Sequence, residues 1–287
     1  GLKVAESAAK TGACLFFSLE MSTEQITARR IAAESGLSIG RLMVGGGLRD
    51  EEQAKLANAA SVLSTHDFRL NRAPGASVSD IAQAAHLAKN LRLVVVDYLG
   101  LVRSDERGLS IYERVTKNSA ALKSLARSLN VPILCLAQLN RAAEQRADKC
   151  PSMADLRDSG AIEQDADAVI LLHRPAAYEA KQPLPWEAQP LTAIVAKNRH
   201  GNIGRLDFDF WGSSGIIMEH RLEVGGMTQA QHYKPADVSR LLLHTPVPRR
   251  KRDRWAAYSA FTNHVLPYVT TEHRDEVCRL AAGRFRV

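Results

Sequence analysis

The sequence contains no long hydrophobic segment and little cysteine, and each absence excludes a class of protein. No apolar run approaches the roughly 18 residues that a transmembrane helix requires, so we expect no membrane partner. The four cysteines are far apart and form no C-x-x-C pair: Cys14, Cys135, Cys150 and Cys278. This spacing argues against a zinc site or a disulfide framework, and it fits a protein of the reducing cytoplasm.

The bulk composition is that of a globular protein with a basic balance. Its 287 residues are 45% hydrophobic and 24% charged, which suits one large domain with an appendage. Lysine and arginine exceed aspartate and glutamate by 38 to 31, for a net charge of +7. This balance favours a partner rich in phosphate but does not by itself identify one.

Short β-branched runs alternate with helical patterns, which predicts an α/β fold with a largely parallel sheet flanked by helices. Leu93–Val96 is apolar without alternation, as expected of a strand buried on both faces. Ser22 and Gln25 have the spacing of a capping box, and the apolar periodicity of Ile111–Asn130 predicts an amphipathic helix. The predicted strands are Ala13–Ser18, Leu93–Asp97, Pro132–Gln138, Ala168–His173, Leu191–Lys197 and Arg205–Phe210.

The character of the chain changes after about Leu222. Glycine, proline and the basic run Arg249–Arg254 predict a linker and basic arm over residues 222–254. Residues 255–287 have helical patterning and form a small, mainly helical appendage of unknown role. We therefore divide the chain into a main domain, 1–221, followed by these two segments. The basic run is as consistent with a solvated arm as with phosphate binding.

Polar segments follow several of the predicted strands, and their order is informative. They are Phe16–Ser22 (FFSLEMS), Leu93–Tyr98 (LVVVDY), Leu136–Arg141 (LAQLNR), Asp155–Asp167 (DLRDSGAIEQDAD) and Lys197–Gly201 (KNRHG). In this order they resemble the RecA-like motor domain of replicative hexameric DNA helicases of the DnaB type. The resemblance extends from Gly1 to about His220. It implies a RecA-like P-loop ATPase core.

The resemblance assigns roles around ATP and Mg²⁺. Asp97 ends an apolar strand and would hold Mg²⁺ through water, and Glu20 would be the general base that polarises the attacking water. Gln138 would sense the γ-phosphate. In isolation Asp97 would be read as a turn cap, and Glu20 as a partner of a helix N-terminus.

Two further segments resemble the family's DNA-binding and interface elements. The polar stretch Arg141–Gln164 looks like a loop of the central channel. Its residues that would contact single-stranded DNA are Arg146, Arg157, Asp158, Ser159 and Gly160. Lys197 and Arg199, expected in a hairpin, would reach a neighbouring subunit's γ-phosphate, which implies a homo-oligomer and, by resemblance, a hexameric ring. A solvated loop and a basic surface hairpin are the alternatives.

One part of the family pattern is absent. The sequence contains no G-x-x-x-x-G-K-[ST] loop; Lys10-Thr11 lacks a preceding glycine turn, and Gly45–Gly47 lacks the following Lys-Ser/Thr. In the family this loop precedes the helix that would begin near Gly1, and the chain does not start with Met. We therefore expect residues to be missing upstream, including the strand that leads into the loop. Alone, the chain should be poorly soluble or unable to hydrolyse ATP.

The resulting hypothesis is an ATP-dependent replicative DNA helicase motor that translocates on single-stranded DNA and unwinds duplex. Primase and a helicase loader are possible partners. Two alternatives stay open: another RecA-type ATPase, such as a recombinase or a primase-fused helicase, and a degenerate, non-hydrolysing DNA-binding or ring-assembly subunit.

Overall fold

The computed structural model describes residues 1–44, 47–106, 108–140, 146, 149–178, 184, 186–220 and 279. The chain divides into two compact units, Gly1–Arg221 and Leu222–Val287. Apart from Arg279, the predicted linker and helical appendage lie outside the described residues. Within the ranges given above, no helix has the length and apolar character needed to cross a membrane.

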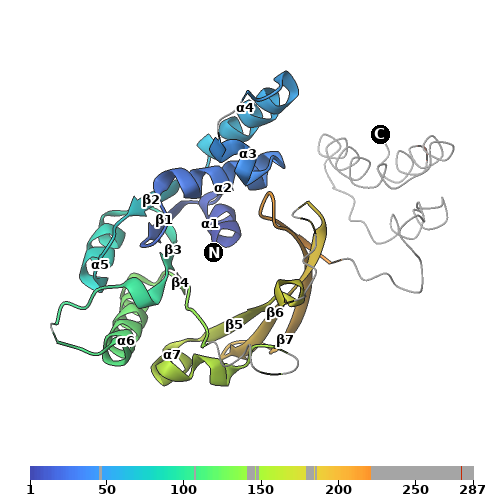
Figure 1. Cartoon of the computed structure of the whole chain (residues 1–287). Helices are drawn as coiled ribbons and strands as arrows, with labels where there is room; N and C mark the ends of the chain where they lie inside the picture. Colours follow the sequence, from blue (N-terminus) through green and yellow to red (C-terminus); the bar gives the residue numbers. More distant parts are fainter. Residues whose placement is uncertain are drawn as a thin grey trace. The chain divides into compact units, whose positions relative to one another are not determined.

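The first part of the main unit is a parallel sheet between two layers of helices (Figure 1). Its strand order is β2-β1-β3-β4, and every neighbouring pair is parallel. The strands are β1 (Ala13–Ser18), β2 (Phe68–Arg72), β3 (Leu91–Asp97) and β4 (Ile133–Cys135). The helices are α1 (Leu2–Ala9), α2 (Thr23–Ser35), α3 (Ile39–Val44), α4 (Asp50–Ser64), α5 (Val78–Leu87) and α6 (Ile111–Leu129), with the 3-10 turn η1 (Leu99–Leu101).

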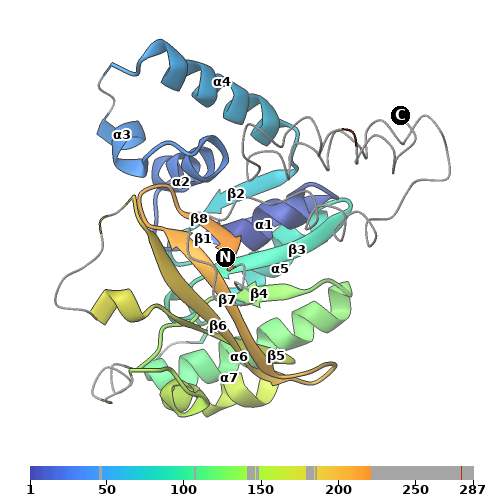
Figure 2. The ribbon, with the colours of Figure 1, turned by 90° about the vertical axis from the view of Figure 1, so that its right-hand side faces the viewer.

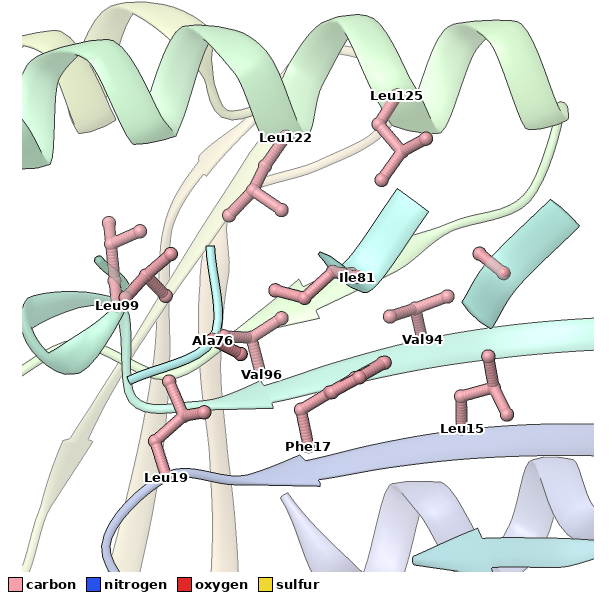
Figure 3. Packing of buried hydrophobic residues seen from close by; sticks show 12 residues of the cluster. Leu15, Phe17, Leu19, Ala76, Ile81, Val94, Val96, Leu99, Leu122 and Leu125 are labelled. Carbon is pink, nitrogen blue, oxygen red and sulfur yellow. The ribbon is translucent and has the colours of Figure 1, made fainter. Parts of the chain in front are cut away.

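Alternate side chains of β1 and β3 pack into two cores, one on each face of this sheet. On one face Phe17 and Val96 meet Ile81 of α5 and Leu122 and Leu125 of α6, as Figure 3 shows. On the other face Phe16 and Val95 pack against Ala5 and Ala9 of α1 and Ile26 of α2. Because both faces are covered, β3 needs the uninterrupted apolar sequence that predicted it.

Several local predictions are confirmed. The hydroxyl of Ser22 accepts from the backbone N–H of Gln25, and the Gln25 side chain accepts from the N–H of Ser22, so α2 begins with the predicted capping box. Helix α6 spans Ile111–Leu129 and ends at Asn130, whose φ of 51° is left-handed.

The second part of the main unit is a separate antiparallel sheet in the order β5-β6-β7-β8. Its strands are β5 (Ala168–His173), β6 (Ala188–Asn198), β7 (Gly204–Trp211) and β8 (Ile216–Glu219), and the turn η4 (Pro175–Tyr178) lies between the first two. The prediction of an α/β fold with a parallel sheet is confirmed for β1 to β4. The later strands run antiparallel, and the short turns that connect β6 to β7 and β7 to β8 cannot make a parallel crossover.

Both sheets end in a strand with an unpaired edge among the described residues. Strand β4 is three residues long and pairs with β3 alone, and β5 pairs with β6 alone. Two side chains of β5 are strongly exposed, Ile170 at 56% and Leu172 at 60%. Among the described residues β4 and β5 are therefore edge strands, and an open edge is a place where a further strand can pair.

The segment between β4 and β5 differs from its prediction. The expected strand Pro132–Gln138 ends at Cys135, so Gln138 lies beyond it. The expected loop Arg141–Gln164 is not irregular throughout, since it contains the 3-10 helix η3 (Met153–Ser159) and the helix α7 (Gly160–Asp165). Helix α7 lies beside α6 in both ribbon views (Figures 1 and 2). Packing against other elements stabilises η3 and α7, and the polar sequence of this segment does not indicate that packing.

Candidate functional site

Two carboxylates gather at the carboxyl edge of the parallel sheet. Strands β1 and β3 are in register so that Ser18 pairs with Asp97, and the N–H of Leu19 donates to the carbonyl of Asp97 at 2.9 Å. Glu20 lies two residues beyond the end of β1 and is exposed, whereas Asp97 is half-buried at the end of β3. In open α/β sheets this edge is where ligands bind.

The electrostatics of Asp97 suit a cation. Burial raises the pKa of Asp97, and the negative charge of Glu20 raises it further, while the N-terminal amine and Arg29 act in the opposite direction. A half-buried carboxylate beside a second acid is stabilised by a bound positive ion.

The donor set fits Mg²⁺ held mainly by water and phosphate. No cluster of three or more His, Cys, Asp or Glu side chains arranged for a metal occurs in the part of the chain that the structure describes. Mg²⁺ commonly takes only one or two carboxylates and keeps several waters. Asp97 would be the residue that holds it.

Gln138 lies near this edge but outside regular structure. The N–H of Leu136 donates to the carbonyl of Val96 at 3.0 Å, and the carbonyl of Leu136 accepts from the N–H of Leu99 at 2.9 Å, so the chain follows the end of β3 before it turns away. Gln138 comes two residues after Leu136 and is exposed. It therefore connects the sheet edge with the segment that contains η3 and α7.

Four of the five predicted DNA-contacting residues lie in η3 and at the start of α7. Arg157 and Asp158 lie in η3 with Ser159, and Gly160 opens α7. Leu156 of η3 is 5% exposed and packs against Val169 and Leu171 of β5, which fixes this helix to the antiparallel sheet.

Arg146 contacts an acid of the 3-10 helix η3. Its guanidinium donates to both carboxylate oxygens of Asp155, at 2.9 and 2.6 Å, and to the carbonyl of Cys150 at 2.5 Å. The backbone N–H and hydroxyl of Ser152 also donate to Asp155, at 2.7 and 3.1 Å. Hydrogen bonding to Arg146 is the main cause that lowers the pKa of Asp155 to about 2. Arg146 is thus bound to Asp155 of η3 and to the backbone of Cys150 in this structure.

Lys197 and Arg199 lie at the end of the β6–β7 hairpin, and this hairpin was predicted. Both side chains point back to α7 of the same chain. The Lys197 ammonium donates to the carbonyl of Glu163, and the Arg199 guanidinium donates to the carbonyl of Gln164 at 2.6 Å. Arg199 also lies 3.5 Å from the carboxylate of Asp167.

Sequence reasoning missed the acids that support these basic residues. Asp155 had a detectable signal, because Ser152 and Asp155 have capping-box spacing. Asp167 had none, because its partners Lys123 and Arg199 come from distant elements. Ser119 of α6, which donates to Asp165 at 2.7 Å, was missed for the same reason.

Comparisons with known proteins find relatives among the replicative DNA helicases. Replicative DNA helicase DnaB of Mycobacterium leprae is 42% identical over 192 residues, covering 66% of this chain and 31% of the relative. Replicative DNA helicase DnaC of Bacillus subtilis is 37% identical over 198 residues, covering 68% of this chain and 43% of the relative. The chain spans less than half the length of these curated relatives.

Solved structures show the same fold. A DnaB-like replicative helicase, studied with its interactions with primase, matches with a TM-score of 0.71 and 28% identity over 77% of this chain and 54% of that chain. The ATPase domain of G40P matches with a TM-score of 0.70 and 28% identity, over 77% of this chain and 79% of its own. These matches confirm the RecA-like fold, and a family model for the DnaB-like helicase C-terminal domain matches residues 1–216. The chain therefore belongs to the DnaB-like helicase C-terminal domain family.

Proposed function

We propose that this chain is the motor part of an ATP-dependent replicative DNA helicase that translocates on single-stranded DNA. The observation that carries the proposal is the register of β1 and β3, which brings Glu20 and Asp97 to one edge of a RecA-like sheet. Family membership supports helicase chemistry, and the two acids supply the groups that such chemistry requires.

The roles proposed at this edge follow from burial and exposure. Bound Mg²⁺ would neutralise phosphate charge at the reacting centre. Asp97 would orient that ion through water, because its position on a buried strand fixes the carboxylate. Glu20 is exposed and can accept a proton from an attacking water. Gln138 would report the γ-phosphate through its amide, which donates and accepts without adding charge.

ATP binding also requires a phosphate-binding loop that the 287 residues do not contain. We propose that the strand leading into such a loop pairs with the open edge of β4, next to the strand that ends in Asp97. A strand in that position would also be able to cover the exposed edge of β5. Whether it comes from the same polypeptide is answered by the reading frame upstream of the Gly1 codon.

The DNA-binding and assembly roles are proposed together. Arg157 and Gly160 would track successive phosphates of a single strand in a central channel, with Asp158 and Ser159. Lys197 and Arg199 would act across a subunit interface of a homo-oligomeric, hexameric ring. Primase and a helicase loader are the proposed protein partners, and the cytoplasm is the proposed location.

The test is ATP hydrolysis and strand unwinding by the polypeptide of the complete reading frame. We expect hydrolysis that single-stranded DNA stimulates, and a loss of about 10²- to 10⁴-fold in kcat in Glu20→Gln with DNA binding retained. Strand exchange without unwinding would instead indicate a recombinase. A polypeptide that binds DNA but neither binds nor hydrolyses ATP would overturn the motor assignment.

A second candidate is a non-hydrolysing DNA-binding or ring-assembly subunit. The absence of G-x-x-x-x-G-K-[ST] from these residues favours it. A native start codon directly before the Gly1 codon, together with DNA binding that is insensitive to nucleotide, would support the non-hydrolysing subunit over the helicase motor.

A further inference from the structure

Helix α7 is too short to be stable by itself. It has six residues, none of them fully buried, and isolated helices shorter than about 12 residues are marginal in water. Its last turn contains no basic residue, and Asp165 adds a negative charge at the end where the helix dipole is already negative. Its stability must therefore come from other elements.

The β6–β7 hairpin supplies the missing positive charge. Lys197 donates to the carbonyl of Glu163 and lies 3.5 Å from that of Gln164. Arg199 donates to the Gln164 carbonyl at 2.6 Å. These carbonyls belong to the last turn of α7, where helical groups lack a partner within the helix. The two cations therefore satisfy the carboxyl end of α7 in both hydrogen bonding and charge.

Asp167 holds this arrangement to the parallel-sheet part of the unit. Its carboxylate forms an ion pair with Lys123 of α6 and lies 3.5 Å from the Arg199 guanidinium, and its carbonyl accepts from the backbone N–H of Arg199 at 2.8 Å. Hydrogen bonding to Lys123 is the main cause that lowers the pKa of Asp167, with Arg199 contributing. Asp167 is thus bound from α6 and from the hairpin at once.

We infer that Lys197 and Arg199 have a second binding partner, the carboxyl end of α7 in their own chain, and that Asp167 is the positioning residue that holds Arg199 there. The inference deepens the proposed function and rests on it for the roles of DNA and of the neighbouring subunit. Since Gly160 opens α7, the hairpin and the DNA-contacting segment are joined by fewer than two turns of helix. A neighbour's phosphate must compete with the α7 carbonyls for the same two cations.

The first test measures α7 directly, without DNA or nucleotide. Amide hydrogen exchange of α7 is compared in the polypeptide of the complete reading frame and in its Lys197→Ala, Arg199→Ala and Arg199→Lys variants. Loss of one charge-assisted hydrogen bond should speed exchange by roughly tenfold. Arg199→Lys keeps the charge but lacks the fork that reaches both Gln164 and Asp167, so an intermediate rate is expected. Lys55→Ala, on the exposed face of α4, is the charge-matched control.

The second test measures DNA affinity, for which the two explanations predict changes in opposite directions. Simple electrostatics predicts that Asp167→Asn binds fluorescent oligo-dT more tightly, because a negative charge is removed. The positioning role predicts weaker binding, by about three- to tenfold, because Arg199 loses its anchor and α7 loosens. Glu51→Gln removes a lysine-paired acid on α4 that is more exposed than Asp167, 75% against 48%, and reports the purely electrostatic effect.

The outcomes separate this inference from the proposed function. Unchanged α7 exchange in both alanine variants, or tighter DNA binding by Asp167→Asn equal to that of Glu51→Gln, overturns the second binding partner. Faster exchange in the alanine variants supports it even if the complete polypeptide proves unable to hydrolyse ATP. Loss of ATP hydrolysis with normal exchange in Arg199→Ala would leave a role in trans alone and would also overturn the inference.

Discussion

Replacing Arg146 by alanine should weaken single-stranded DNA binding without changing its salt dependence. Arg146 was predicted to contact DNA, but its guanidinium is bound bidentately by Asp155 and also meets the Cys150 carbonyl. The backbone of Asp155 also contacts Asn140, since its carbonyl accepts from the N–H of Asn140 at 3.0 Å. We therefore expect Arg146 to act on DNA through the shape of the loop.

The size of the expected loss follows from the burial of Asp155. Asp155 is 4% exposed, and removing one partner of a buried ion pair typically costs about 3–5 kcal/mol. The Arg146 side chain is 38% exposed, so solvent reduces this value. Ser152 still donates two hydrogen bonds to Asp155 in the variant. We expect a local loss of about 2 kcal/mol, which limits the fall in DNA affinity to about 30-fold.

The assay is fluorescence anisotropy of labelled oligo-dT over a series of salt concentrations. A phosphate contact made by Arg146 would lower the slope of log K against log salt by about 0.7 in the alanine variant. The loop role predicts an unchanged slope, a similar loss in Asp155→Ala, and no further loss in the double variant. Lys55→Ala serves as the control for a simple change in net charge. A reduced slope, with losses of affinity that add in the double variant, would refute the reasoning and would indicate that Arg146 contacts a DNA phosphate directly.

Two further predictions concern stability. Burial raises the pKa of Asp97 above its ordinary 3.8, so the folded state loses stability as the pH rises through the raised value. Asp97→Asn should therefore have a higher melting temperature than the unmodified protein at pH 7 but not below pH 3.8. An equal gain in melting temperature at both pH values would contradict this. Gly12→Ala should cost about 1–3 kcal/mol in the free energy of unfolding, because an added Cβ would lie 2.6 Å from the carbonyl oxygen of Asn90. The matched control is Gly40→Ala in α3, where the nearest atom is 3.7 Å away, and melting curves that do not separate the two variants would contradict the packing argument.

The parts of the fold that were predicted correctly carry strong local signals. Val94–Val96 is fully buried and was recognised by its uninterrupted apolar run, and Ser22 was recognised by its capping box. Strand β2 was missed because Phe68–Arg72 is short, has only two apolar residues, Phe68 and Leu70, and lies at a half-exposed edge of the sheet. Helix α4 was missed because its sequence is mostly polar and alanine-rich, and only Ala59 is buried.

The candidate site also contains residues whose position could be predicted from the sequence and residues whose partners could not. Glu20 and Asp97 follow buried strands, so their position at one sheet edge could be predicted from the chain alone. The partners of Arg146 and Arg199 could not, since charged side chains choose among many nearby acids and carbonyls only after the elements have packed. The roles of all these residues in catalysis and DNA binding stay predictions.

The two sheets differ in how far apart in the chain their neighbouring strands lie, and this difference bears on the order of folding. Strands β6, β7 and β8 pair across short turns, whereas Ser18 meets Asp97 only after α2, α3, α4, β2 and α5 have intervened. Local hairpins form in microseconds, while pairing between distant strands must first overcome the entropy of closing a long loop. The antiparallel sheet, with the hairpin that holds α7, should therefore acquire hydrogen-exchange protection early in refolding. The sheet edge that contains Glu20 and Asp97 should become protected last.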